Sequence, residues 1–385
     1  MKRALYTDDH EQFRGVVREF ASREVAPHVQ RWEDDRLIDR GVWQAAGKQG
    51  VLGLSAPEQY GGGGQRRDYR YRAIVLEELA RVHATSLASG FSLQDDIAIP
   101  YLDSLATPEQ KQRWLPGMAS GELIGAIAMT EPGTGSDLRG IRATAAKVAG
   151  GWVVNGAKTF ITNGIQSDLV ITVVRTGPGG GSRDFSLLVA ERDMPGFSRG
   201  RKLDKVGLHG QDTAELVFQD VFIPEDNLLG EPGGGFGHLV DHLPLERLSI
   251  AVQAVSSADA IFRSTVAYTD ERTAFGEKIA DFQHTRFVLA DIATELDVTR
   301  TFVDQAILAY NEGALSVVDA AKAKLWASEM QNRVVDRCLQ LHGGYGYMLE
   351  YPVARAYQDA RIQRIFGGTN EIMRQIIGRD VVGRR

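Results

Sequence analysis

Cysteine is almost absent from this chain of 385 residues, in which Cys338 is the single copy. One thiol excludes an intramolecular disulfide and also excludes a zinc site built from a cluster of cysteines. A chain without disulfides suits a reducing compartment. The length and the hydrophobic content of 43% are sufficient for an apolar core. We therefore expect a folded protein of two or three domains that holds no metal.

Long apolar runs are missing as well. The longest, such as "LIGAIAM" at 123–129, fall far short of the roughly 20 residues that a membrane span needs. The segment "MKRALYTDDHEQF" contains no apolar core of signal-peptide length. A basic surplus is also lacking, since the net charge is −6, which argues against nucleic-acid binding. We expect a soluble cytoplasmic protein, or a mitochondrial matrix protein if a eukaryotic precursor has been processed.

Three stretches of different character follow one another, and together they predict a mainly α protein with a central β domain. Residues 1–125 show helical periodicity, residues 126–231 are rich in β-formers, and residues 232–385 return to long helical patterns. Helical segments do not alternate with the predicted strands, so an antiparallel, barrel-like sheet is favoured over βαβ units. The predicted domains are an N-terminal all-α domain, a middle β domain and a C-terminal four-helix bundle.

Short local signals locate individual elements. "TPEQKQRWL" begins a helix, with Thr107 as the N-cap, Pro108 at the first position and Gln110 at the third. The pair Asn155-Gly156 predicts the two-residue turn of a β-hairpin. Pro244 is typical of the first turn of a helix. These signals predict two helix starts and one hairpin turn.

Two adjacent glycines precede the last predicted helix, in "RIFGGTNEIMRQI". Glycines at a helix start either supply an unusual backbone conformation or remove side chains so that another group can approach the backbone. From the residues alone, both interpretations of Gly367 and Gly368 stay open.

Five motifs resemble those of the acyl-CoA dehydrogenase family and occur in that family's order. They are "AMTEPGTGSD" (128–137), "KTFITNG" (158–164), "ERTAFGEKIADFQ" (271–283), "QLHGGYGY" (340–347) and "FGGTNEIM" (366–373). Each one alone is open to a plain interpretation, such as a Gly/Pro turn, a solvated arginine at a helix end, or a loop that terminates a helix. Their common order, together with the helical, β and helical stretches, makes the resemblance specific.

The glycine-rich loop at 128–137 also has a physical interpretation, because its glycines allow close backbone approach and supply amide donors for phosphates. By resemblance, this loop and the "FITN" strand bind FAD. The resemblance also implies that the motifs at 271–283 and 340–347 complete the FAD site of a neighbouring subunit in a homotetramer, the usual form of the family. The cofactor-binding residues that the resemblance implies are Ile127, Met129, Thr130, Gly135, Ser136, Phe160, Thr162, Arg272, Phe275, Gln283, Gln340, Gly344, Thr369 and Glu371.

The resemblance implies α,β-dehydrogenation of an acyl-CoA thioester to the trans-2-enoyl-CoA. A base removes the α-proton while a hydride leaves the β-carbon for flavin N5, and hydrogen bonds polarise the thioester carbonyl. The base must be a carboxylate close to the α-carbon, in a dry site that raises its pKa. Many family members carry this glutamate directly before the Gly-Thr of the last motif, where this chain has Gly367.

A branch of the family that includes isovaleryl-CoA and long-chain acyl-CoA dehydrogenases supplies the glutamate from an "LER" sequence. In "HLPLERLSIA" the matching residue is Glu246, so the resemblance implies Glu246 as the base, with Gly367 leaving room for it. An acid near a helix start also has a plain role, which is to compensate the helix dipole. Glu131 in the glycine-rich loop and Glu371 in the last motif are competing carboxylates, which we rank below Glu246.

The expected substrate-binding residues are Ser136, Arg247, Gly367 and Gly368, with Arg247 supporting the base. The implied partners are acyl-CoA and an electron-transfer flavoprotein. Three alternatives stay open: an acyl-CoA oxidase that passes electrons to oxygen, a dehydrogenase of acyl groups on a carrier protein, and a flavin-binding protein without catalysis. Gly367 motivates the last of these. The sequence does not indicate the length or branching of the acyl group.

Overall fold

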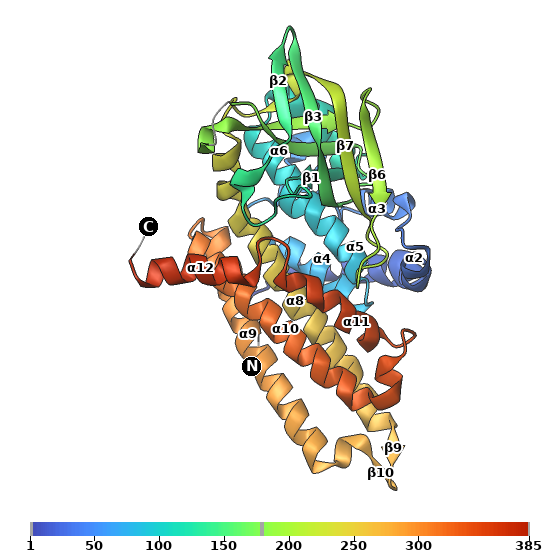
Figure 1. The fold of residues 1–385 in the computed structure, drawn as a ribbon. Coiled ribbons are helices and arrows are strands. Elements are labelled where there is room, and N and C mark those ends of the chain that lie inside the picture. The colour runs from blue at the N-terminus through green and yellow to red at the C-terminus, as the bar shows by residue number, and fades with distance from the viewer. Residues whose placement is uncertain (1–2, 178–180, 384–385) are drawn as a thin grey trace.

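The fold is described by a computed structural model that covers residues 3–177 and 181–383. Helices occupy both ends of the chain and a β-sheet occupies the middle, as Figure 1 shows. The predicted mainly α architecture with a central β domain is therefore confirmed. The N-terminal helices are α1 (Asp8–Phe20), α2 (Val29–Asp35), α3 (Arg40–Lys48), α4 (Tyr69–Arg81), α5 (Thr85–Ser92), α6 (Ile99–Leu105) and α7 (Pro108–Ser120).

The start of α7 is as predicted. The Thr107 hydroxyl accepts a hydrogen bond from the Gln110 amide, and the Gln110 side chain accepts one from the Thr107 amide at 2.8 Å. This reciprocal cap satisfies two amides that the helix itself leaves unpaired. Further back, a π-helical segment at Leu93–Ala98 joins α5 to α6 without a break in the helical path. That continuity fixes where the side chains of α6 point.

The middle of the chain forms one sheet of eight strands in the order β6-β7-β3-β2-β4-β5-β8, with β1 beside β4. Most neighbouring strands are antiparallel, as predicted, while β1 and β2 run parallel to β4. The predicted turn at "TGPGGGSRD" includes residues 178–180, which lie outside the described residues. The strands are β1 (Gly125–Ala128), β2 (Thr144–Val148), β3 (Gly151–Thr162), β4 (Leu169–Arg175), β5 (Phe185–Glu191), β6 (Phe197–Lys202), β7 (Thr213–Pro224) and β8 (Leu228–Leu229).

The hairpin turn predicted at Asn155-Gly156 was wrong. Both residues lie inside β3, where the pairing with β7 shifts register in a β-bulge. A Cβ at Gly156 would lie 2.6 Å from the Cβ of Ala143, so glycine is needed for close packing. The Asn155 side chain bonds across to Asp220, donating to its carboxylate and accepting from its amide, each at 2.9 Å. The turn itself falls at Gly150, whose φ is +79°.

The C-terminal part consists of long helices, as predicted, and a short hairpin of β9 (Thr273–Ala274) and β10 (Glu277–Lys278). We propose the predicted domain boundaries 125/126 and 231/232, since β1 begins at Gly125 and α8 at Gly235. The helices are α8 (Gly235–Glu271), α9 (Gln283–Asn311), α10 (Val317–His342), α11 (Pro352–Ala360) and α12 (Asn370–Val381).

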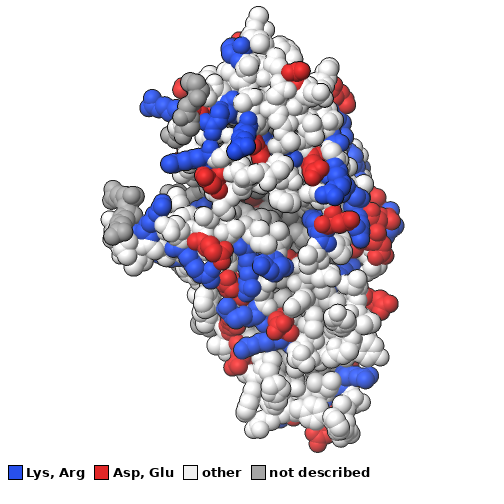
Figure 2. All heavy atoms as spheres, in the orientation of Figure 1, with Lys and Arg blue, Asp and Glu red and all other residues white. Residues whose placement is uncertain are grey.

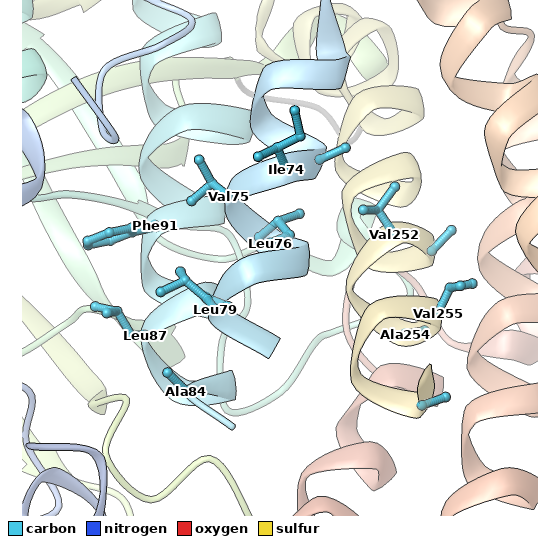
Figure 3. Packing of buried hydrophobic residues seen from close by; sticks show 14 of the residues in the cluster. Ile74, Val75, Leu76, Leu79, Ala84, Leu87, Phe91, Val252, Ala254 and Val255 are labelled. Carbon is cyan, nitrogen blue, oxygen red and sulfur yellow. The ribbon is translucent and has the colours of Figure 1, made fainter. Parts of the chain in front are cut away.

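One apolar core joins the two helical parts. In Figure 3, Leu76 of α4 lies on the side that faces Val252 of α8, whereas Leu79 points toward Leu87 and Phe91 of α5. All five side chains are buried. Helix α8 is therefore held by the N-terminal helices along its middle, which fixes the face that α8 presents to them.

Pro244 is not in the first turn of its helix, so this prediction was wrong. Helix α8 begins at Gly235, and Pro244 lies inside it. A proline inside a helix removes one backbone hydrogen bond. Here Leu239 before it and Leu248 after it are both buried, so packing on both sides of the proline stabilises the continuous helix. Residues close to Pro244 consequently sit in a helix interior, away from the helix start.

No helix among the described residues is long and apolar enough to cross a membrane. On the face drawn in Figure 2, acidic and basic side chains are interspersed.

Candidate active site

Glu246 lies on the buried side of α8 with 5% of its surface exposed. Its Oε1 accepts a hydrogen bond of 3.3 Å from the hydroxyl of Tyr101 on α6. Burial raises the pKa of Glu246 to about 7, while the Tyr101 hydrogen bond and the charge of Arg247 act in the opposite direction. A carboxyl with a pKa near neutrality can accept and release a proton, as a general base must. Because Glu246 lies deep in α8, compensation of the helix dipole does not explain it.

Arg247 is buried beside Glu246, with 4% of its surface exposed. Burial lowers the pKa of its guanidinium, and the charge of Glu246 opposes that shift. Among the described residues, its Nε and Nη1 atoms have no hydrogen-bond partner. Buried donors without a partner cost free energy unless a ligand satisfies them. Arg247 is thus suited to bind an oxygen of a ligand next to Glu246.

Gly367 and Gly368 form the turn before α12, with φ values of +63° and +89° that favour glycine. A Cβ at Gly367 would lie 2.4 Å from Cδ1 of Ile250, and one at Gly368 would lie 3.9 Å from Nη2 of Arg247. The positive φ values agree with the first interpretation, an unusual backbone conformation. The approach of Ile250 agrees with the second, the removal of a side chain so that another group can come close. Ile250 is one helical turn beyond Glu246, so the turn faces the same part of α8. The side chain that fills the space at Gly367 is Ile250, which refines the expectation that this space accommodates Glu246.

The glycine turn is held from its other side by α10. The Nζ of Lys324 donates to the Gly368 carbonyl and to Oδ1 of Asn370, each at 2.8 Å. Burial lowers the pKa of Lys324 to about 7. Thr369 caps α12 by accepting a hydrogen bond from the Ile372 amide at 3.4 Å. The turn is thus fixed between α8 and α10.

The predicted FAD loop leaves the end of β1 and folds back onto β3. The Thr159 amide donates to the Thr130 carbonyl at 2.9 Å. Phe160 follows with a φ of +59° and 67% of its surface exposed. A Cβ at Gly133 would meet no atom within 4 Å, and one at Gly135 only a methyl carbon at 4.0 Å. An exposed aromatic ring beside an open glycine-rich loop fits a ligand with an aromatic ring and phosphates, as FAD has.

The remaining predicted residues of this region differ in exposure. Ile127 is buried in β1, Met129 and Thr162 are half-buried, and Ser136 is exposed on the loop. Strand order brings the ends of β1 and β3 together, so these residues surround one place in the fold. The structure therefore joins the first two motifs, which are separated by 20 residues in the chain.

The competing carboxylates have other environments. The Glu131 carboxylate accepts hydrogen bonds from Lys158 Nζ at 2.8 Å and from the amides of Arg142 and Ala143 at 2.7 and 2.9 Å. Its oxygens are occupied by groups that hold the loop in shape. Glu371 is exposed on α12, with 79% of its side chain accessible, so it lacks a dry environment. Glu246 is the one of the three that combines burial with little hydrogen bonding.

A second group of predicted cofactor-binding residues lies at the far end of the C-terminal helices. In Figure 1 the hairpin of β9 and β10 lies at the opposite end of the molecule from the sheet. The guanidinium carbon of Arg272 is 5.5 Å from the centre of the Tyr345 ring, and Phe275 is 99% exposed. In the structure, the motifs at 271–283 and 340–347 lie next to each other, but they lie far from the predicted FAD loop of the same chain. The group comprises Arg272, Phe275, Gln283, Gln340 and Gly344.

Sequence reasoning missed Tyr101 and Lys324. Tyr101 reaches Glu246 across 145 positions of the chain, and Lys324 reaches Gly368 across 44. Neither belongs to one of the five motifs, and each looks like an ordinary residue of a helix. Only the packing of α6 and α10 against the site reveals them.

Comparisons with known proteins identify the family. Three family descriptions match: acyl-CoA dehydrogenase, N-terminal domain, over residues 7–122; middle domain, over 126–221; and C-terminal domain, over 233–382. The chain is 47% identical over 382 residues to the long-chain specific acyl-CoA dehydrogenase, mitochondrial, of Sus scrofa, covering 99% of this chain and 88% of that protein. It is 37% identical over 379 residues to the isovaleryl-CoA dehydrogenase, mitochondrial, of Oryza sativa subsp. japonica, covering 98% and 92%.

Solved structures show the same similarity. The acyl-CoA dehydrogenase from Geobacillus kaustophilus matches with a TM-score of 0.96 and 47% identity, covering 99% of this chain and 100% of that one. The butyryl-CoA dehydrogenase from Megasphaera elsdenii matches with a TM-score of 0.94 and 34% identity, covering 99% and 100%. The chain belongs to the acyl-CoA dehydrogenase family of oxidoreductases, which use FAD to dehydrogenate acyl-CoA thioesters.

Proposed function

We propose that Glu246 is the base that removes the α-proton of the acyl-CoA thioester. The observation that carries this proposal is a buried carboxyl whose pKa is raised to about 7. Within the described residues, its side chain accepts one hydrogen bond, from Tyr101. A carboxylate held in this way keeps oxygen lone pairs available for a proton. Of the competing carboxylates, Glu131 is already hydrogen-bonded to Lys158, and Glu371 is exposed to solvent.

The neighbouring residues would prepare the substrate. Bound FAD supplies the acceptor for the hydride that leaves the β-carbon. Burial around Glu246 excludes water, which strengthens the interactions of the charged base. The turn at Gly367 and Gly368 would line the substrate site with its backbone, because it faces the part of α8 that carries Glu246, where Ile250 fills the space beside Gly367. The unpaired donors of Arg247 would bind an oxygen of the substrate or support the ionised base.

The base assignment is tested with Glu246→Gln, which keeps the size of the side chain and removes its basicity. The FAD-loaded variant is mixed with hexadecanoyl-CoA without oxygen, and bleaching of the flavin is followed. We expect bleaching to slow by about 10²–10⁴-fold while the FAD absorbance shows that the cofactor stays bound. Glu312→Gln on the exposed turn after α9 controls for the exchange itself. A Glu246→Gln enzyme that keeps a tenth of the wild-type rate would refute the assignment.

For the substrate, we propose a long-chain acyl-CoA. This choice rests on the 47% identity to relatives named long-chain specific, whereas the relatives named for isovaleryl-CoA reach 37%. A panel of acyl-CoAs from four to sixteen carbons, with branched members included, is compared by the rate of flavin bleaching. The highest kcat/KM is expected among the longer chains. Preference for isovaleryl-CoA, or for an acyl group on a carrier protein, would reject the proposal.

The electron acceptor is proposed to be an electron-transfer flavoprotein. One solved structure that matches this chain, with a TM-score of 0.94 and 34% identity, is described as the electron transferring flavoprotein of Acidaminococcus fermentans. During turnover in air the enzyme should therefore form little hydrogen peroxide, and an added electron-transfer flavoprotein should accept its electrons. Stoichiometric peroxide would instead identify an oxidase.

We propose a homotetramer in which one chain completes the FAD site of another. The support is the separation of the two groups of predicted cofactor-binding residues in a single chain. Phe275, which is 99% exposed, belongs to the group at the far end. Light scattering of the FAD-loaded enzyme should give four times the mass of the chain. Arg272→Ala should lower the FAD content, and a fully flavinated monomer would contradict the proposal.

For the compartment we propose the cytoplasm, or the mitochondrial matrix in a eukaryote. Relatives include a mitochondrial protein of Sus scrofa and an acyl-CoA dehydrogenase of Bacillus subtilis. Fractionation of the source cells, followed by detection of the chain with an antibody, tests this assignment.

A further inference from the structure

The Tyr101 hydroxyl is placed directly on the proposed base. Tyr101 is fully buried on α6, and its hydroxyl is 3.3 Å from Oε1 of Glu246. An ionised carboxylate can only accept hydrogen bonds, so the phenol donates to it. A donor of this kind favours the ionised form of the carboxyl. It also restricts the rotation of the Glu246 side chain, because moving Oε1 away would leave a buried hydroxyl without a partner.

His242 holds the Tyr101 ring. It lies one turn before Glu246 on α8, and the two rings stack with centroids 4.0 Å apart and planes 24° from parallel. The imidazole is itself fixed, because Nδ1 is 2.8 Å from the His238 carbonyl and Nε2 is 2.7 Å from Oγ of Ser104. Burial lowers the pKa of His242, which favours the uncharged ring beside Glu246, while its hydrogen bonds to the His238 and Pro100 carbonyls act in the opposite direction.

Other charged groups act on this pair from several elements. On α8, the positive charge of Arg247 favours ionisation of Glu246, and Asp241 acts on Tyr101. From the segment before α6, Asp96 accepts a hydrogen bond of 2.5 Å from Ser249, which follows Glu246 by three positions on α8.

More distant charges act through these neighbours. Arg66 acts on His242, and Lys324 of α10 lies close enough to Arg247 for their charges to interact. The Tyr101 hydroxyl differs from all these groups because it touches a carboxyl oxygen of Glu246.

We propose that Tyr101 is a positioning residue for Glu246, with its hydroxyl holding Oε1 in place and stabilising the carboxylate, and that stacking on His242 keeps the hydroxyl there. This inference rests on the proposed role of Glu246 as the base. It assigns functions to two residues outside the five motifs, on α6 and on α8.

Tyr101→Phe tests the proposal because it keeps the ring and removes only the hydroxyl. The rate of flavin bleaching by saturating hexadecanoyl-CoA is measured without oxygen from pH 5.5 to 9.5. Loss of the donor should raise the pH at which the rate is half-maximal by about half a unit to one unit. This shift lies at the lower end of the range for a hydrogen bond to a charged group, because a distance of 3.3 Å is long for such a bond. On the acid side the variant should be about threefold to tenfold slower, and the difference should narrow toward pH 9, where the carboxylate is ionised in both enzymes.

A merely structural role for Tyr101 predicts a different result. Damage to packing or to FAD binding would lower the rate by the same factor at every pH. Tyr6→Phe is the matched control, since it removes a tyrosine hydroxyl that donates to Oε1 of Glu77 at 2.6 Å and has no contact with Glu246, Tyr101 or His242. It should keep the wild-type pH profile. An unchanged midpoint in Tyr101→Phe, or a uniform loss of rate, would overturn the proposal.

The stacking partner provides a second variant in case Tyr101→Phe does not fold. His242→Ala frees the Tyr101 ring and should raise the midpoint in the same direction, whereas His242→Phe keeps a ring to stack on and should raise it less. Equal midpoints in both His242 variants and the wild type would overturn the role of the stack. Glu246→Gln separates the positioning role of Tyr101 from the assignment of Glu246 as the base. If the flavin of Glu246→Gln bleaches at the wild-type rate, the base is another residue. If Glu246→Gln is inactive but the midpoint of Tyr101→Phe is unchanged, only the positioning role is rejected.

Discussion

Two buried carboxyl groups of this chain have opposite surroundings. Glu131, in the loop after β1, is 7% exposed and accepts hydrogen bonds from a lysine and two backbone amides. Glu246, on α8, is 5% exposed and is bonded to one phenol. Burial is nearly the same, so burial alone does not decide what a glutamate does. The number and charge of its donors do.

The difference separates a structural acid from the proposed base. At Glu131 the charge of Lys158 and the two amides compensate the loss of water, and the ion pair holds the proposed FAD loop against β3. At Glu246 compensation is incomplete, and the pKa is raised to about 7. A carboxylate that acts as a base needs this incomplete compensation, because hydrogen bonds to all its oxygens would lower its pKa and weaken its affinity for a proton.

Breaking the ion pair of Glu131 should give the largest change in stability. Glu131→Gln leaves the Lys158 ammonium, which has no exposed surface, without a counter-charge. We expect a loss of about 3–5 kcal/mol in the free energy of unfolding, as is typical when one partner of a buried pair is removed. The measurement is urea unfolding followed by tryptophan fluorescence, together with the FAD content of the purified protein.

A double variant sharpens this result. Glu131→Gln with Lys158→Met removes both charges and should recover part of the lost stability, because no uncompensated ion remains. If Glu131→Gln is as stable as the wild type, the contrast between the two glutamates is lost and Glu131 becomes a second candidate for the base.

Removing the charge of Glu246 should raise the free energy of unfolding, whereas removing that of Glu131 should lower it. The size of the Glu246 effect should depend on pH. The pKa of Glu246 is raised from 4.5 to about 7 in the folded chain. Below pH 4.5 the group is protonated in both the folded and the unfolded state and costs nothing. As the pH rises, the unfolded chain ionises first, so the folded state loses stability progressively until the pH exceeds 7.

Glu246→Gln cannot ionise and should escape this loss. Compared with the wild type, it should be more stable by at most about 1 kcal/mol at pH 5 and by up to about 3 kcal/mol at pH 8. Thermal unfolding of both FAD-loaded proteins between pH 5 and 8 measures the difference. A gap that does not change with pH would show that the carboxyl of Glu246 is already ionised in the folded protein at pH 5.

The parts of the fold that could be predicted from the sequence are those decided by near neighbours. The cap at Thr107 involves partners three residues apart, and it was predicted correctly. The turn at Asn155-Gly156 was predicted wrongly, because the bulge there depends on contacts with Ala143 and Asp220 from other strands. In the site, the motifs identified the family. Tyr101 remained hidden, because its partner Glu246 is 145 positions away.

Moving the carboxyl to the glycine turn should give the smallest effect, and it tests whether the turn and α8 face one substrate carbon. In the Glu246→Gln background, Gly367→Glu alone should restore no bleaching. Its Cβ would lie 2.4 Å from Cδ1 of Ile250, and a φ of +63° costs a residue with a side chain about 1–2 kcal/mol. Adding Ile250→Ala removes the collision and opens a path for the new carboxyl. That triple variant should regain roughly 1% of the wild-type bleaching rate, since a misplacement of about 1 Å costs around a hundredfold. Gly367→Gln in place of Gly367→Glu is the matched control without a base, so equal rates in the two triple variants would show that the turn does not reach the α-carbon.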